Sequence, residues 1–209
     1  MGSAFRGARI RPSMPLPFVI GVTGGIATGK SSVLALLAER GAETIDADAV
    51  YHALIGPGGP LVAPIAARFG SDMVAEDGSI DRRALAGIVF ADRDALADLD
   101  VITHPAVIEA IRGRIAASTA RVVAVDAVKL IESGLADICD SVWLVVCDPQ
   151  IQRARLMRRN GLTSDEADLR MAAQPNEGSR RARADVVIDN SGTLDDLERQ
   201  VSEYWQLVK

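Results

Sequence analysis

The stretch that decides the fold of this chain is residues 18–32, FVIGVTGGIATGKSS. Residues 18–23 are mainly apolar and predict a short buried strand, and residues 30–40 carry apolar side chains at the spacing of an amphipathic helix. Between them, residues 24–31 match the pattern G-x-x-x-x-G-K-[ST]. In such a loop successive backbone N–H groups point inward at a phosphate. Because the motif joins a predicted strand to a predicted helix, we expect a phosphate-binding loop rather than an ordinary glycine-rich turn.

The parts of this loop have different expected roles. Glycines allow the backbone angles that the loop needs, and the N-terminal end of the following helix adds partial positive charge. We expect Lys30 to neutralise the β- and γ-phosphates of ATP and the Ser31 hydroxyl to ligate Mg²⁺. The predicted nucleotide contacts are Gly25, Ile26, Ala27, Thr28, Gly29, Lys30, Ser31 and Ser32.

The rest of the chain continues to alternate strands and helices. Further strands are predicted at residues 43–45, 121–125, 141–146 and 185–188, and a last amphipathic helix near 193–207. This alternation predicts the α/β class, with a parallel sheet of the P-loop NTPase type and helices on both faces. After the turn signal GPGGP at residues 56–60, residues 61–117 show helical patterns without a convincing strand. We therefore expect a helical insertion into the sheet.

The composition limits the kinds of function. The 209 residues have a formal net charge of −5, which argues against a general nucleic-acid binder because phosphate backbones require broad basic surfaces. No apolar run approaches the ~20 residues that span a bilayer. Residues 1–16 are basic and contain proline, but they lack the apolar core of a secretory signal. We expect a flexible N-terminal extension at residues 1–16, no membrane partner and a cytoplasmic protein.

Two carboxylates follow the second predicted strand. Asp46 and Asp48 should lie at the carboxyl edge of the sheet, where open α/β folds bind their ligands. A carboxylate there could accept the proton of an attacking hydroxyl in phosphoryl transfer. One of the two could instead cap the following helix, and position in the sequence does not choose between them.

A local basic cluster lies at residues 152–159, QRARLMRR. Arg155 and Arg159 are four residues apart and therefore share a helix face. Guanidinium groups on a closing lid can bind a transferring phosphate and exclude water, although a solvated charged helix has the same pattern.

Several motifs occur together in one order: TGGIATGKSS, IDADAV, FG with DGSIDRRAL and VF, ITHP, and finally ADVVIDNSG. In this combination the chain resembles the dephospho-CoA kinase family over about residues 17–207. The resemblance implies transfer of the ATP γ-phosphate to the ribose 3′-hydroxyl of dephospho-CoA, the last step of coenzyme A synthesis. ATP, dephospho-CoA and Mg²⁺ are the implied ligands, and a monomer is favoured.

The resemblance also implies how the chain is divided. Residues 17–60 and 118–209 would form the nucleotide-binding core, with a lid at about 150–172. Residues 61–117 would form a helical domain on the CoA side.

The same resemblance implies roles for single residues. Asp48 would be the general base, and Lys30 and Arg155 would share in catalysis. Arg82 and His104 would bind the acceptor, Arg159 would contact the nucleotide from the lid, and Asn190 would lie beside the adenine. Taken alone, His104 before a proline is more typical of helix capping or packing.

The match is weakest at residues 125–132, VDAVKLIE. Val128 and Lys129 replace the Pro-Leu pair of the family pattern, while Leu130 and Glu132 remain. Burying an unpaired ammonium is costly, so Lys129 should reach solvent, pair with an acid or meet a phosphate. Two alternatives stay open: a nucleoside or nucleotide kinase with the same core, and an ATP-binding regulatory protein with weakened catalysis.

Overall fold

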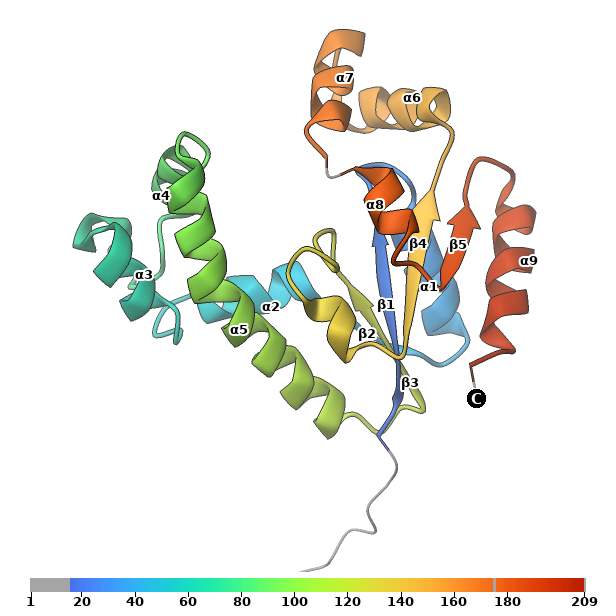
Figure 1. Cartoon of the computed structure of the whole chain (residues 1–209), viewed down its shortest axis with the longest axis horizontal. Coiled ribbons are helices and arrows are strands. Elements are labelled where there is room, and N and C mark those ends of the chain that lie inside the picture. The colour runs from blue at the N-terminus through green and yellow to red at the C-terminus, as the bar shows by residue number, and fades with distance from the viewer. Residues whose placement is uncertain (1–15, 175, 209) are drawn as a thin grey trace, which may run out of the picture.

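The computed structural model describes residues 16–174 and 176–208. The predicted N-terminal extension, residues 1–16, lies outside this part of the chain except for Leu16. The described residues form a sheet whose five strands run parallel in the order β2-β3-β1-β4-β5 (Figure 1). The predicted α/β class and parallel sheet are confirmed.

The elements follow one another along the chain as the sequence predicted. The strands are β1 (Phe18–Gly24), β2 (Glu43–Asp46), β3 (Val122–Asp126), β4 (Ser141–Val146) and β5 (Val186–Asp189). The helices are α1 (Lys30–Glu39), α2 (Ala47–Leu54), α3 (Val62–Phe69), α4 (Arg82–Val89), α5 (Arg93–Ala117), α6 (Pro149–Asn160), α7 (Ser164–Ala172), α8 (Glu177–Arg181) and α9 (Leu194–Trp205). Two short 3₁₀ turns are η1 (Ser71–Met73) and η2 (Leu135–Ile138). Each strand lies within one residue of its predicted bounds.

Both faces of the sheet are covered, because its strands alternate their apolar side chains between two cores. On β1, Val19 packs with α5 and η2, whereas Ile20 and Val22 pack with α1 and α9. The same alternation holds on β3, where Val123 and Val125 belong to the first core. Strands that are apolar on both faces are what a covered parallel sheet requires.

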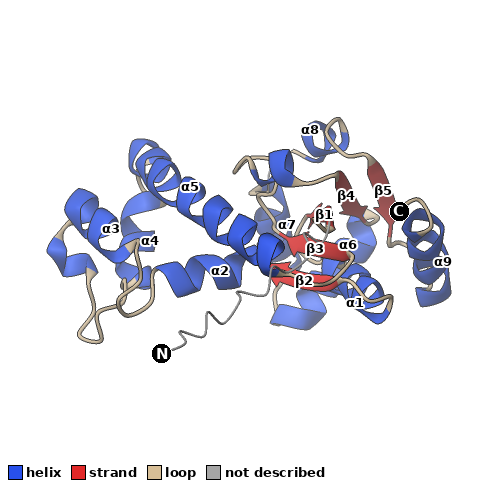
Figure 2. Cartoon of the chain, turned by 90° about the horizontal axis from the view of Figure 1, so that it is seen from below, coloured by secondary structure: helices blue, strands red, loops and turns tan. Residues whose placement is uncertain are grey.

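The predicted helical insertion connects β2 to β3 (Figure 2). Helices α3, α4 and the first half of α5 enclose a separate apolar core that includes Ile65, Leu85 and Leu99. The second half of α5 leaves this core and packs Val107, Ile111 and Ile115 against the sheet. One continuous helix therefore joins the helical lobe to the sheet, and the division into domains stays a prediction.

Helices α6 and α7 lie beyond the carboxyl ends of the strands (Figure 1). Asp148 begins α6 by accepting hydrogen bonds from Gln150 N and Ile151 N, and Arg153 Nε lies 2.6 Å from Asp168 Oδ1 on α7. This ion pair is not aligned as a hydrogen bond. In the part of the chain that the structure describes, no helix has both the length and the apolar character that crossing a bilayer would require.

The packing of α5 on the sheet generates a stability prediction. Ile111 is fully buried there, so Ile111→Ala should lower the free energy of unfolding by about 2–5 kcal/mol through lost burial and a residual cavity. Arg114→Ala, on the exposed side of the same helix, should change it by no more than about 0.5 kcal/mol. Urea denaturation followed by circular dichroism measures both. Equal effects of the two variants would contradict the described orientation of α5.

Candidate active site

The phosphate-binding loop lies at the carboxyl end of β1, the central strand of the sheet, whose neighbours are β3 and β4. Gly29 precedes α1 with φ of 95°, and Ala27 is the one non-glycine residue with positive φ in the described ranges, at 58°. Left-handed backbone at two nearby positions gives the loop the curvature that directs N–H groups inward. The predicted loop residues Gly25 to Ser32 therefore lie around one concave turn at the start of α1.

A residue distant in sequence binds this loop through a hydrogen bond to its backbone. Asn190, only 7% exposed after β5, donates from Nδ2 to Thr28 O at 2.8 Å. A methyl group on Gly29 would lie 1.9 Å from the same nitrogen, so this position admits only glycine. Thr28 Oγ1 donates to Gly25 O at 2.9 Å and closes the turn. Asn190 was predicted beside the adenine, and the structure shows its side-chain amide bonded to the loop.

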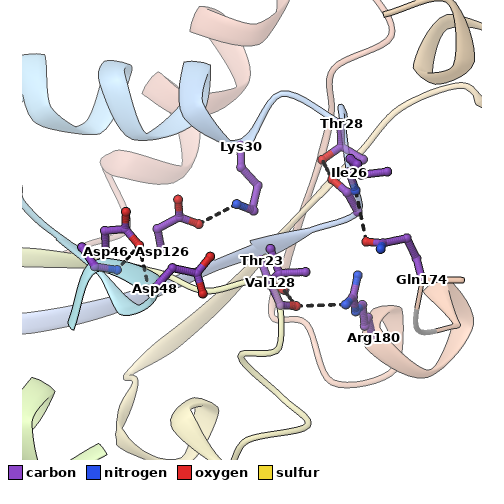
Figure 3. A network of polar contacts seen from close by, with 12 residues as sticks. Thr23, Ile26, Thr28, Lys30, Asp46, Asp48, Asp126, Val128, Gln174 and Arg180 are labelled. Carbon is purple, nitrogen blue, oxygen red and sulfur yellow. Dashed lines mark hydrogen bonds and ion pairs between the residues drawn. The ribbon is translucent and has the colours of Figure 1, made fainter. Parts of the chain in front are cut away.

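Two glutamines that the sequence reasoning missed, one on α6 and one after α7, bind the loop. Gln152 Nε2 on α6 donates to Ile26 O at 2.6 Å. Ile26 N donates to Gln174 Oε1 at 3.3 Å (Figure 3). Both glutamines lie in polar segments, where no periodic or motif signal distinguishes them from solvated residues.

A lysine and a carboxylate meet directly in front of the loop. Lys30 Nζ lies 2.7 Å from Asp126 Oδ1, and both side chains are largely withdrawn from solvent. The strand register explains the contact, because Asp126 at the end of β3 is paired with Val22 of β1 and Asp46 of β2. The ends of three neighbouring strands thus bring the loop lysine and the acidic residues to one edge.

The two aspartates after β2 have different environments. Asp46 Oδ1 accepts from Asp48 N at 2.8 Å and from Ala49 N at 3.2 Å, which makes Asp46 the N-cap of α2. The Asp48 carboxylate is exposed in the first turn of α2 and, within residues 16–174 and 176–208, has no hydrogen-bond or ion-pair partner. Figure 3 shows it beside the Lys30–Asp126 pair. The alternative that the sequence left open therefore has a geometric answer: Asp46 caps, and Asp48 is available.

A cleft of about 530 Å³ extends from Asp48 between α2, α4, α5 and the segment after β3. Apolar side chains of α4 and α5, such as Leu85, Val89 and Leu99, line much of it. Tyr51 also lines the cleft, and burial raises the pKa of its hydroxyl, while the charge of Arg82 lowers it and that of Asp100 raises it. The cleft therefore combines an apolar wall with a few charged groups, the usual composition of a site for an organic ligand.

The predicted acceptor-side residues line this cleft. Arg82 is the first residue of α4, after its N-cap Asp81. His104 lies inside α5, not at a helix end, and its Nε2 is 3.2 Å from Asp100 Oδ1 one turn earlier. The capping alternative for His104 is therefore wrong. Lys129 reaches the same cleft, and its Nζ is 3.7 Å from Asp100 Oδ2.

Arg155 and Arg159 of α6, which were predicted to lie on a lid, differ in their surroundings. Arg155 Nη1 donates to Cys147 Sγ at 3.4 Å, and a methyl group on Gly29 would lie 3.8 Å from that nitrogen. Arg155 therefore faces the phosphate-binding loop. Arg159, one turn later, is exposed and donates to the adjacent Asn160 Oδ1 at 3.1 Å. The structure brings only the first of these arginines to the loop.

Arg180 is a further residue that the sequence reasoning missed. It is 2% exposed, its Nε donates to Glu132 Oε1 at 3.2 Å, and its Nη2 donates to Val128 O at 2.9 Å. Thr23 Oγ1 donates to the same carbonyl at 3.0 Å. The run SRRARAD gave no sign of which arginine would be buried, because burial is decided by the segment after β3 that packs on it.

The oxygen donors of the site fit the predicted Mg²⁺. Ser31 supplies a hydroxyl at the start of α1, and Asp126 supplies a carboxylate at the end of β3. Magnesium takes hard oxygen ligands, and an ion that arrives with ATP needs only one or two from the protein because phosphates and water supply the others.

A larger hollow, of about 1120 Å³, lies at the opposite end of the sheet, where β1 begins. Phe18, Arg121 and Trp205 line it, and Phe18 is the first residue of β1, at the far end from the loop. This hollow is therefore separate from the candidate active site.

Comparison with known proteins agrees with this geometry. The family model described as dephospho-CoA kinase matches residues 18–196. The dephospho-CoA kinase of Streptomyces avermitilis is 45% identical over 187 residues, which cover 89% of this chain and 91% of that protein. That of Geobacter sulfurreducens is 44% identical over 190 residues, covering 90% and 96%. The crystal structure of TT1252 from Thermus thermophilus is 32% identical with a TM-score of 0.78, covering 93% of this chain and all of that one.

The match spans the phosphate-binding loop, both aspartates after β2, the cleft and the last strand. This chain belongs to the dephospho-CoA kinase family.

Proposed function

We propose that this chain transfers the γ-phosphate of ATP to the ribose 3′-hydroxyl of dephospho-CoA with Asp48 as the general base. The observation that carries the proposal is the position of the Asp48 carboxylate. It stands without a partner in the described ranges, between the Lys30–Asp126 pair and the cleft. A hydroxyl that enters from the cleft meets Asp48 on the way to a phosphate held by the loop.

The residues around the loop divide the work of phosphoryl transfer. Lys30, now paired with Asp126, would turn its ammonium group to the β- and γ-phosphates. Arg155 would approach the same phosphates from α6 and oppose the charge that develops on them. Mg²⁺, when bound through Ser31 Oγ and Asp126, supplies further positive charge to the phosphate oxygens.

The cleft suits an acceptor with one long uncharged arm. Side chains of α4 and α5 such as Leu85 and Leu99 would contact that arm, while Arg82 and His104 supply polar contacts at the cleft wall. We propose the same role for these two residues as the sequence predicted. Asn190 would act by fixing the loop through Thr28 O, and Arg159 would reach the nucleotide as the lid closes.

The first prediction about catalysis concerns the acceptor. ADP release from ATP, measured in a coupled assay, should depend on added dephospho-CoA, and the product should carry one additional phosphate on the ribose. Nucleosides and nucleoside monophosphates offered in its place should give background rates. A preferred nucleoside acceptor would identify a nucleotide kinase instead, and ATP binding without any acceptor-dependent turnover would identify a regulatory protein.

The second prediction separates the two aspartates. Asp48→Asn should lower kcat by about 10²–10⁴-fold, because the hydroxyl loses its proton acceptor. Asp46→Asn should leave kcat within about threefold, because asparagine caps a helix as well as aspartate does. Steady-state kinetics with dephospho-CoA measures both. Full turnover in Asp48→Asn would remove this residue as the base.

The third prediction concerns the lid. Arg155→Met should lower kcat by about 10²-fold, because a guanidinium that faces the transferred phosphate is lost. Arg158→Met, an exposed neighbour on the same helix, is the matched control and should retain the wild-type kcat. Similar losses in both variants would indicate a general effect of charge on α6 and would contradict a specific role for Arg155.

A further inference from the structure

The segment after β3 holds Lys129 in a fixed place at the border of the cleft. The preceding carbonyl, Val128 O, accepts hydrogen bonds from Thr23 Oγ1 at 3.0 Å and from the buried Arg180 at 2.9 Å. Lys129 O itself accepts from Ser133 N at 2.9 Å. With the backbone held on both sides, Lys129 is kept at the wall of the cleft that it lines.

The side chain of Lys129 keeps donors available in that cleft. It is 51% exposed and lines the cleft wall, and its partner within the described residues is Asp100, at 3.7 Å between Nζ and Oδ2. This distance exceeds that of a hydrogen bond, and exposed ion pairs of this kind contribute little to stability. Asp100 is shared as well, because its other oxygen lies 3.2 Å from His104 Nε2. An anionic ligand group could therefore replace Asp100 as the partner of Lys129 at a small cost in free energy.

The position of Lys129 along the chain relates it to the site of transfer. It follows Asp126, the partner of Lys30, by three residues. In dephospho-CoA the ribose that carries the reacting 3′-hydroxyl also carries the diphosphate, on its 5′ carbon. When the hydroxyl lies at Asp48, the diphosphate must lie a few bonds away, inside the cleft that Asp48 and Lys129 both line.

We propose that Lys129 binds the diphosphate of the acceptor. The inference rests on the proposed function, because the acceptor's chemistry supplies the diphosphate. Binding exchanges the long contact to Asp100 for a charge-assisted hydrogen bond to a phosphate oxygen. The contact is made equally before and during transfer, so it acts on acceptor affinity and not on the rate of the chemical step.

The test begins with a variant that removes the charge and keeps the length of the side chain. Lys129→Met should raise KM for dephospho-CoA by about tenfold, with kcat and KM for ATP unchanged. Calorimetric titration with dephospho-CoA should show the same loss in Kd. The matched control is Arg83→Met, an exposed cation of α4 outside the cleft lining, which should leave KM unchanged. An unchanged KM in Lys129→Met, or an equal rise in the control, would overturn the proposal.

A second variant distinguishes phosphate binding from a purely structural tie between the segment after β3 and α5. Asp100→Asn removes the charge that competes for Lys129, so KM for dephospho-CoA should fall or stay the same if Lys129 binds the diphosphate. If the ion pair only holds the cleft together, Asp100→Asn and Lys129→Met should raise KM alike, and the proposal is wrong.

The wild-type protein in the same assay distinguishes a failure of the proposed function from a failure of the role of Lys129. Wild type that does not use dephospho-CoA contradicts the proposed function itself. Wild type that uses it, together with an unaltered Lys129→Met variant, contradicts only the role of Lys129.

Discussion

The ion pair between Lys30 and Asp126 connects the parts of this molecule on which its chemistry depends. One partner begins α1 directly after the phosphate-binding loop, and the other ends β3 beside it. Their 2.7 Å separation requires β1 and β3 to be neighbours in register, so the sheet's strand order is a condition of the site. The aspartate stabilises the lysine charge in this structure, and its carboxylate is an oxygen ligand of the kind that Mg²⁺ takes.

Around this pair, side chains of the same chemical type have different roles. The hydrogen bonds that each one makes decide whether it holds the structure or stays available for a ligand. Asp46 is occupied by two backbone N–H groups, so its carboxylate stabilises the start of α2. The Asp48 carboxylate, two residues later, is exposed beside the Lys30–Asp126 pair. Arg180 is likewise committed to Glu132 and to Val128 O, whereas Arg155 turns toward the loop. Asp46 is exposed and Arg180 is buried, but both have their polar atoms engaged in these contacts and serve the structure, whereas the Asp48 carboxylate has no partner within the described residues.

The segment after β3 links the phosphate-binding loop to the cleft. Its carbonyl at Val128 accepts hydrogen bonds from Thr23, just before the loop, and from Arg180 of α8. Its next residue, Lys129, lines the cleft. Val128 and Lys129 depart from the family pattern without disturbing the backbone of this segment. The Lys129 side chain is exposed, and the hydrogen bonds that hold the backbone are made to the Val128 carbonyl, not to its side chain.

The sequence by itself determined the elements and the chemistry of the loop. Apolar periodicity and glycine spacing act over a few residues, so the strands, to within one residue, and the loop between β1 and α1 could be predicted locally. The ordered motifs identified the family in the same way. Tertiary structure decided the rest: which aspartate is available, that His104 lies within a helix, that Arg180 is buried, and where Lys129 reaches. These outcomes depend on contacts between residues far apart, such as Lys30 with Asp126 at a separation of 96 and Asn190 with Thr28 at 162. Such contacts exist only once the sheet register and the packing of α5 are set, and no local pattern encodes them.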